Sequence, residues 1–188
     1  MSLQPATRTD QRPPPRWSER LEEFLPAAEP LAVAWLKEPG LLTERLRACC
    51  AGKQGLVVIA ELEAPLAPGD AVVLQTPGGA AFVREVELTC DGRPWVFAQS
   101  LIPLATLARQ RWLASLGRAA LGEKLAALPA LERGALEFTR LTAGDRLYHH
   151  ALRNRPEPPQ ALWARRSWFA IDGDRLLVQE VFLPELYS

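Results

Sequence analysis

The sequence lacks several features that whole classes of protein require. No run approaches the roughly 18 consecutive apolar residues of a membrane-spanning helix. The first 17 residues, MSLQPATRTDQRPPPRW, lack the apolar stretch of a secretory signal. Lys plus Arg and Asp plus Glu both number 22, so the net charge is zero. Because a neutral protein has no overall field that attracts a polyanion, we expect no nucleic-acid partner. The missing apolar runs lead us to expect a cytoplasmic protein with no membrane span.

Cysteine and histidine are too scarce to suggest a metal centre. The three cysteines, Cys49, Cys50 and Cys90, include no CxxC spacing, and the first two are too close together for an ordinary disulfide with each other. We therefore expect free, partly buried thiols and no metal site. A catalytic cysteine would need a histidine partner, and the two histidines, His149 and His150, are adjacent. A Cys–His pair is the less favoured alternative.

Phosphate-binding glycine motifs are also missing. The one glycine cluster, in TPGGAA at 76–81, is not followed by the helix start that an anion site requires, so a turn is expected there. Residues 1–16 hold four prolines and three arginines and almost no large apolar side chains. Such a composition cannot offset the entropy of ordering. We predict a flexible tail over 1–16 and a single domain over 17–188.

The pattern of apolar residues predicts an α+β domain. Helical spacing covers 17–25, 30–36, 41–50, 104–117 and 121–129, whereas strand signals fall at 55–63, 71–76, 80–90, 94–102, 135–142, 162–171 and 174–183. Asp-Gly pairs at 91–92 and 172–173 predict two hairpins. The segment 144–160 is expected to be a surface loop with a helical turn. These signals favour one antiparallel sheet of about six strands with helices packed on one side.

Two charged residues fall on apolar strand faces. Alternate residues of a strand share a face, so Arg84 points with Val86 and Leu88, and Glu180 points with Val178. An unpaired buried guanidinium costs several kcal/mol or more, so Arg84 must have an anionic partner. Two interpretations stay open: a purely structural Arg84–Glu180 ion pair, or a pocket for a small carboxylate that also carries a hydroxyl group.

The adjacent arginines of the next-to-last predicted strand must point to opposite faces. These are Arg165 and Arg166, and we expect at least one of them to be solvated. The six tryptophans are scattered among segments, so core packing explains them better than a base-stacking platform does.

The segment FVREVELTCDGRPWVFAQSLIPLATL resembles the central segment of the chorismate pyruvate-lyase family. That family has an Arg-Glu pair, an (Asp/Asn)-Gly-x-Pro turn and a closing proline. In this sequence they are Arg84, Glu85, Asp91, Gly92, Pro94 and Pro103. Further matches are the Leu-Gly-x-x-x-Leu-Gly stretch that begins at Leu116 and the C-terminal hairpin with Glu180 and Pro184. The resemblance runs from about Trp35 to Leu186.

This resemblance implies a cofactor-independent enzyme that converts chorismate to 4-hydroxybenzoate and pyruvate, the first committed step towards ubiquinone. It implies that Arg84 binds the ring carboxylate, that Glu180 contacts the ring hydroxyl, and that both are catalytic. It further implies substrate contacts through the backbone at Leu42 and Leu121. The expected partners are the substrate chorismate and its product, and we expect a monomer.

Departures from the family pattern leave two other functions open. Leu42 stands where the family often has Met, Gln99 stands where it has Arg, and the loop at 144–160 is longer. Gln99 puts in doubt a second anion contact near the product exit. One alternative is a non-catalytic domain of the same fold that senses small molecules. Because only about 50 residues precede the sheet, a helix-turn-helix module of such a sensor is not expected. The other alternative is a structural or interaction protein that retains the fold after losing activity.

Overall fold

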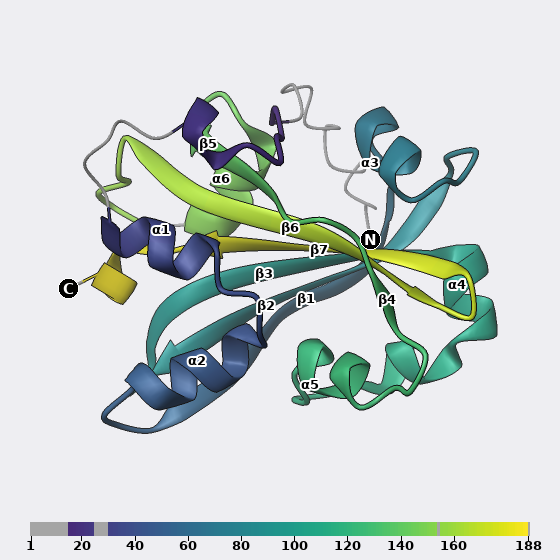
Figure 1. Cartoon of the computed structure of the whole chain (residues 1–188), viewed down its shortest axis with the longest axis horizontal. Helices are drawn as coiled ribbons and strands as arrows, with labels where there is room; N and C mark the ends of the chain where they lie inside the picture. Colours follow the sequence, from purple (N-terminus) through teal and green to yellow (C-terminus); the bar gives the residue numbers. More distant parts are fainter. Residues whose placement is uncertain (1–14, 25–29, 154, 188) are drawn as a thin grey trace, which may run out of the picture.

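A single antiparallel sheet organises the chain. The computed structural model describes residues 15–24, 30–153 and 155–187, so residues 1–14 of the predicted tail lie outside the described residues. The sheet has seven strands in the order β1-β2-β3-β7-β6-β4, and β5 also pairs with β6 (Figure 1). The strands are β1 (Gln54–Pro65), β2 (Ala80–Cys90), β3 (Arg93–Pro103), β4 (Glu132–Arg133), β5 (Glu137–Thr142), β6 (Ala161–Ile171) and β7 (Asp174–Phe182).

Both predicted hairpins are present. Asp91 and Gly92 join β2 to β3 with φ of 48° and 77°, and Asp172 and Gly173 join β6 to β7 with φ of 52° and 84°. Two successive residues with positive φ match the right-handed twist of the flanking strands, which is why Asp-Gly is favoured there. Strands β3 and β7 pair with each other, so the two hairpins together form the centre of the sheet.

Helices cover both faces of the sheet. The α-helices are α1 (Pro30–Leu36), α2 (Leu42–Cys49), α3 (Pro68–Val73), α4 (Leu104–Arg109), α5 (Leu121–Ala126) and α6 (Arg146–Leu152), and the 3-10 turns are η1 (Leu21–Glu23), η2 (Arg111–Ser115) and η3 (Pro184–Tyr187). Figure 1 shows α2 and α5 on one side of the sheet and α6 on the other.

The α+β class is confirmed, but the prediction that the helices pack on one side is wrong. Helices α1, α2 and α5 contribute to the cores around Phe182 and Ile102, whereas α6 packs on the opposite face against Phe97 and Val181. The central strands are buried on both faces, so both faces need cover. The predicted strand at 71–76 is also wrong: α3 begins at Pro68, and a short apolar run does not distinguish a helix from a strand.

A disulfide joins Cys50 to Cys90, with a Cα–Cα distance of 5.7 Å. The prediction of free thiols is therefore wrong for these two residues, while Cys49 is free and exposed. The pairing depends on the register in which Gln54 lies opposite Cys90, and sequence spacing does not reveal this register. The bond ties the end of α2 to the end of the strand that carries Arg84.

None of the described helices is long and apolar enough to cross a membrane.

Candidate active site

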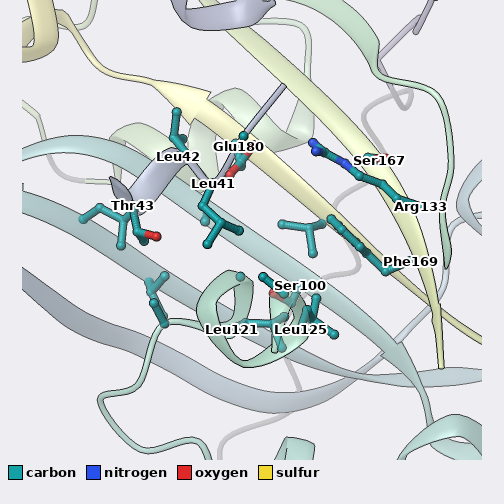
Figure 2. Close-up of a pocket in the computed structure, with 18 of the residues that line it drawn as sticks. Leu41, Leu42, Thr43, Ser100, Leu121, Leu125, Arg133, Ser167, Phe169 and Glu180 are labelled. Carbon is teal, nitrogen blue, oxygen red and sulfur yellow. The ribbon is translucent and has the colours of Figure 1, made fainter. Parts of the chain in front are cut away.

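A cavity of about 250 Å³ lies between the sheet, the start of α2 and helix α5. All four residues implied as substrate contacts line it: Leu42, Arg84, Leu121 and Glu180. Figure 2 shows the leucines of the α2 start and those of α5 on opposite sides of this space. Two segments that are far apart in sequence therefore enclose the strand face that carries the buried charges.

Most of the cavity wall is aliphatic. The apolar lining includes Leu41, Leu56, Val86, Leu88, Leu125 and Val178. Four charged side chains interrupt it: Arg84, Arg133, Arg165 and Glu180. A small apolar pocket with a few convergent polar groups is the usual form of a site for an organic anion.

Arg84 is held rigidly at the floor of the cavity, and its side chain is only 1% exposed. Its Nε donates to Glu61 Oε1 at 3.1 Å, and its Nη2 donates to the carbonyl oxygens of Gly117 at 2.7 Å and Ala119 at 3.2 Å. None of its hydrogen bonds with described residues uses Nη1. The guanidinium is thus fixed by three acceptors, with one nitrogen left for a ligand.

The Arg84–Glu180 ion pair that sequence left open is wrong. The anionic partner that Arg84 requires is Glu61, which lies directly opposite it in the β1–β2 register. Glu180 instead accepts from Arg165 Nε at 2.6 Å, between directly opposite residues of β7 and β6. Hydrogen bonds of Glu180 with described residues use Oε2 alone, so Oε1 remains available.

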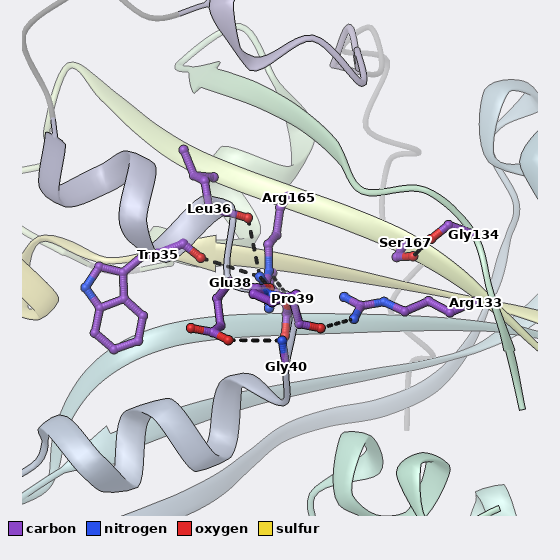
Figure 3. A network of polar contacts seen from close by, with 10 residues as sticks. Trp35, Leu36, Glu38, Pro39, Gly40, Arg133, Gly134, Arg165 and Ser167 are labelled. Atoms are coloured by element: carbon purple, nitrogen blue, oxygen red, sulfur yellow. Dashed lines mark hydrogen bonds and ion pairs between the residues drawn. The ribbon is translucent and has the colours of Figure 1, made fainter. Parts of the chain in front are cut away.

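Arg165 anchors Glu180 to the segment that leads into α2. Its side chain is 1% exposed, and its Nη1 donates to the carbonyl oxygens of Trp35, Leu36 and Glu38, the last at 2.7 Å (Figure 3). Arg166 on the other face is also buried and pairs with Glu137 and Asp70. The expectation that one of the two arginines is solvated is therefore wrong, because each is buried and paired with a carboxylate.

The start of α2 presents polar groups to the cavity. Leu42 and Thr43 occupy its first turn, where backbone N–H groups have no partner within the helix. The hydroxyl of Thr43 is buried and has no hydrogen-bond partner among the described residues. Leu121 likewise begins α5. Buried hydroxyls nearly always have a partner, so the lone Thr43 hydroxyl is an unsatisfied polar group at the cavity wall.

Arg133 is a cavity residue that sequence reasoning missed. It lies on β4, where it pairs with Phe169 of β6, and its guanidinium sits 5.3 Å from the Phe169 ring centroid. Its Nη1 donates to the Pro39 carbonyl oxygen at 2.8 Å (Figure 3). Although the residue is exposed by area, dehydration of the guanidinium lowers the pKa of Arg133, and the charge of Arg165 lowers it further. A two-residue strand has no periodicity by which it could be predicted.

Gln99 lies on the opposite face of the sheet and does not line the cavity. It donates to Glu85 Oε1 at 2.9 Å and accepts from Gln179 at 3.3 Å. An anion contact at this position would therefore fall outside the cavity.

The two histidines lie on α6, within the segment that we predicted to be a loop with a helical turn. His150 Nδ1 contacts Glu85 Oε1 at 2.6 Å, and His149 contacts the Ala143 carbonyl oxygen at 2.8 Å. The less favoured alternative, a catalytic Cys–His pair, required a histidine beside a cysteine. The contacts of both histidines with described residues are to other groups. Across the described residues, no group of three or more side chains could hold a metal ion.

The sequence of the chain matches a family of known proteins. The chain matches the family model described as chorismate lyase over residues 18–188. It is 41% identical to a protein of Thiobacillus denitrificans over 156 residues, which are 82% of this chain and 83% of that protein. It is 37% identical to a protein of Nitrosospira multiformis over 89% of this chain and 96% of that protein. Both carry the name "Probable chorismate pyruvate-lyase".

Solved structures resemble the fold at low identity. The effector domain of PhnF from Mycobacterium smegmatis superposes with a TM-score of 0.53 at 15% identity, over 78% of this chain and 90% of that one. A GntR-family transcriptional regulator from Bacillus cereus gives a TM-score of 0.54 at 13% identity, over 73% and 96%. At these identities the likeness extends to the fold alone.

Proposed function

The chain belongs to the chorismate lyase family, and from this premise we propose that it cleaves chorismate to 4-hydroxybenzoate and pyruvate in the cavity described above. One observation carries the assignment of the site. The four residues implied by the resemblance come from four separate elements, yet all line the same cavity.

The free donors and acceptors of the cavity match the two ends of the product ring. Arg84 Nη1 is available for the ring carboxylate, together with backbone N–H groups at Leu42 and Leu121 and the Thr43 hydroxyl. Glu180 Oε1 is available to accept from the ring hydroxyl. Arginine suits a carboxylate because its fork of N–H donors matches the two oxygens.

The reaction requires little of the protein beyond positioning of the substrate. The ether bond between the ring and the enolpyruvyl group breaks, and its electron pair leaves on the enolpyruvyl oxygen. The ring carbon that bears the hydroxyl loses its hydrogen as a proton, which makes the ring aromatic. The departing enolate gains a proton on its methylene carbon and becomes pyruvate. The sum is redox-neutral, so we propose a mechanism without a cofactor.

The aliphatic wall favours this step by excluding water around the fixed charges. Preorganised charges in a dry site act more strongly than in water and need no rearrangement during the reaction. Holding the substrate in a reactive conformation lowers the barrier further. The Arg165–Glu180 ion pair serves this purpose by fixing the Glu180 carboxylate.

The direct test mixes the purified protein with chorismate and follows both products by chromatography. Equal amounts of 4-hydroxybenzoate and pyruvate, lost in Arg84→Ala and retained in the exposed control Arg93→Ala, are expected. Recovery of unchanged chorismate would contradict lyase activity. Saturable binding of chorismate in that case would indicate a small-molecule sensor or a lyase that has lost activity.

A second experiment separates two roles of Glu180. If Glu180 accepts a proton during the reaction, Glu180→Gln should lower kcat strongly while 4-hydroxybenzoate still binds. Near-normal turnover of this variant would rule out proton transfer and leave Glu180 an orienting role.

We also propose that residues 17–188 act as one domain and that the protein is a cytoplasmic monomer serving ubiquinone synthesis. Disulfides are uncommon in reducing compartments, so the Cys50–Cys90 bond makes cell fractionation the informative test. Sedimentation analysis tests the monomer.

A further inference from the structure

Three guanidinium groups line the cavity, but only two have a carboxylate partner. Arg84 pairs with Glu61, and Arg165 pairs with Glu180. Arg133 forms no ion pair with any described residue, and its one hydrogen bond goes to the neutral carbonyl of Pro39. Its positive charge is therefore uncompensated at the wall of a largely apolar cavity.

The surrounding chain holds Arg133 in place. The backbone of β4 pairs with Phe169, and the next residue, Gly134, donates its N–H to the Trp168 carbonyl oxygen at 2.9 Å. A Cβ atom at Gly134 would lie 2.1 Å from the Trp168 ring, so only glycine allows this approach. The guanidinium is thus presented to the cavity by a fixed backbone and by contact with the Phe169 ring.

The location of Arg133 relative to the other charges is informative. Arg133 donates to the Pro39 carbonyl oxygen, and Arg165 donates to the preceding one, that of Glu38. Because Arg165 is the ion-pair partner of Glu180, Arg133 belongs to the Glu180 end of the cavity. Figure 2 shows Arg133 and Phe169 on the side of the cavity away from Thr43. This leaves Arg84 and Arg133 to serve two different anionic groups of one ligand.

We propose that Arg133 binds the second carboxylate of the substrate, the one on its enolpyruvyl group. This inference rests on the proposed function. The enolpyruvyl ether is attached to the ring carbon next to the one that bears the hydroxyl. With the hydroxyl at Glu180, the second carboxylate falls at the same end of the cavity as Arg133. The product 4-hydroxybenzoate lacks this carboxylate, so Arg133 distinguishes substrate from product.

The test compares two ligands that differ by one carboxymethoxy group, which carries the second carboxylate. They are 4-hydroxybenzoate and 3-(carboxymethoxy)-4-hydroxybenzoate, a stable ether that keeps the ring carboxylate and the hydroxyl. Calorimetric titration of Arg133→Gln should show roughly 10- to 100-fold weaker binding of the dicarboxylate, the size of one charge-assisted hydrogen bond. Affinity for 4-hydroxybenzoate should change by less than about twofold.

Two further variants complete the design. Arg140→Gln is the matched control, since Arg140 is also exposed and lies 5.8 Å from an aromatic ring centroid, that of Trp163, but outside the cavity. It should leave both affinities unchanged. Arg133→Lys keeps the charge and should retain part of the preference for the dicarboxylate.

Equal loss of both ligands in Arg133→Gln, or no loss of either, would overturn the proposal. The wild-type assay with chorismate decides the proposed function separately. If the wild type makes both products, kcat/KM for chorismate should fall in Arg133→Gln by the same factor as the dicarboxylate affinity. If the wild type makes no product, the lyase assignment fails. The two titrations would still decide whether Arg133 binds a second carboxylate.

Discussion

The two faces of the sheet both bury charge, but they do so differently. On the face covered by α6, five polar residues lie directly opposite one another across five strands: Glu85, Gln99, Gln179, Arg166 and Glu137. Hydrogen bonds link Glu85 to Gln99, Gln99 to Gln179, and Arg166 to Glu137. Contacts from His150 and Arg153 complete the partners of Glu85.

The cavity face leaves its polar groups incomplete. Arg84 Nη1, Glu180 Oε1 and Thr43 Oγ1 form no hydrogen bonds with the described residues. Full satisfaction stabilises a fold, whereas donors and acceptors left open in a cavity are available to a ligand. Buried charge alone therefore does not mark a site in this protein, whereas an incomplete set of hydrogen bonds does.

The largest effect is expected for a change on the cavity face. Arg84→Met fills a similar volume but removes the carboxylate contact, so kcat/KM for chorismate should fall by about 100- to 1,000-fold, or about 3–4 kcal/mol. Steady-state kinetics measures this. The unfolding free energy should also fall, by about 1–3 kcal/mol, because Glu61 and two backbone carbonyl oxygens lose their donor. A large loss of stability with unchanged kcat/KM would mean that Arg84 resembles the residues of the other face.

The reverse is expected for Glu85. In Glu85→Ala the groups contributed by His150, Arg153 and Gln99 lose their shared partner, which should cost about 2–3 kcal/mol in unfolding free energy. Urea denaturation gives this value, and kcat/KM of the folded protein should not change. The control is Glu63→Ala, at an exposed position of the edge strand β1. If Glu85→Ala abolished substrate binding in folded protein, the two faces would not be separate in function.

The pH dependence of stability provides another test of the contrast between the two faces. Burial alone would raise the pKa of Glu85, but hydrogen bonds from His150 and Gln99 and the charges of His150 and Arg153 hold that pKa below its ordinary value. The unfolded chain therefore takes up this proton first, near a pKa of about 4.3. The stabilisation is present above that pH and is lost as the pH falls through the lower folded-state pKa.

Wild type should accordingly lose more stability than Glu85→Gln between about pH 5 and pH 3. Urea unfolding at several pH values in this window measures the difference. Identical slopes for the two proteins would show that Glu85 does not titrate abnormally in the folded state.

Local periodicity predicted much of the cavity face. Alternation along β2 and β7 turned Arg84 and Glu180 towards the apolar side, and the structure places both in one cavity. The two Asp-Gly hairpins were predicted equally well, because a turn of this type depends on the residues within it. The family resemblance added Leu42 and Leu121, which line that cavity as well.

What sequence could not predict depends on contacts between distant strands. Glu61 is the partner of Arg84 because β1 pairs with β2 in one particular register, and Arg165 is the partner of Glu180 because β6 lies beside β7. The Cys50–Cys90 bond has the same origin. Arg133 was missed because β4 is too short to show a strand pattern.

The smallest effect is expected for the lone hydroxyl of Thr43. Thr43→Val replaces an unpartnered buried hydroxyl by a methyl group, so the free protein should be unchanged or up to about 1 kcal/mol more stable. Binding of 4-hydroxybenzoate should weaken by about 3- to 10-fold if the hydroxyl contacts the carboxylate.

Thr106 offers a matched control, since its buried hydroxyl donates to the Arg175 carbonyl oxygen at 3.0 Å. Thr106→Val should cost about 1 kcal/mol in stability without affecting binding. Thermal unfolding and calorimetric titration of the two variants would give opposite patterns, and matching patterns would mean that the Thr43 hydroxyl is not reserved for a ligand.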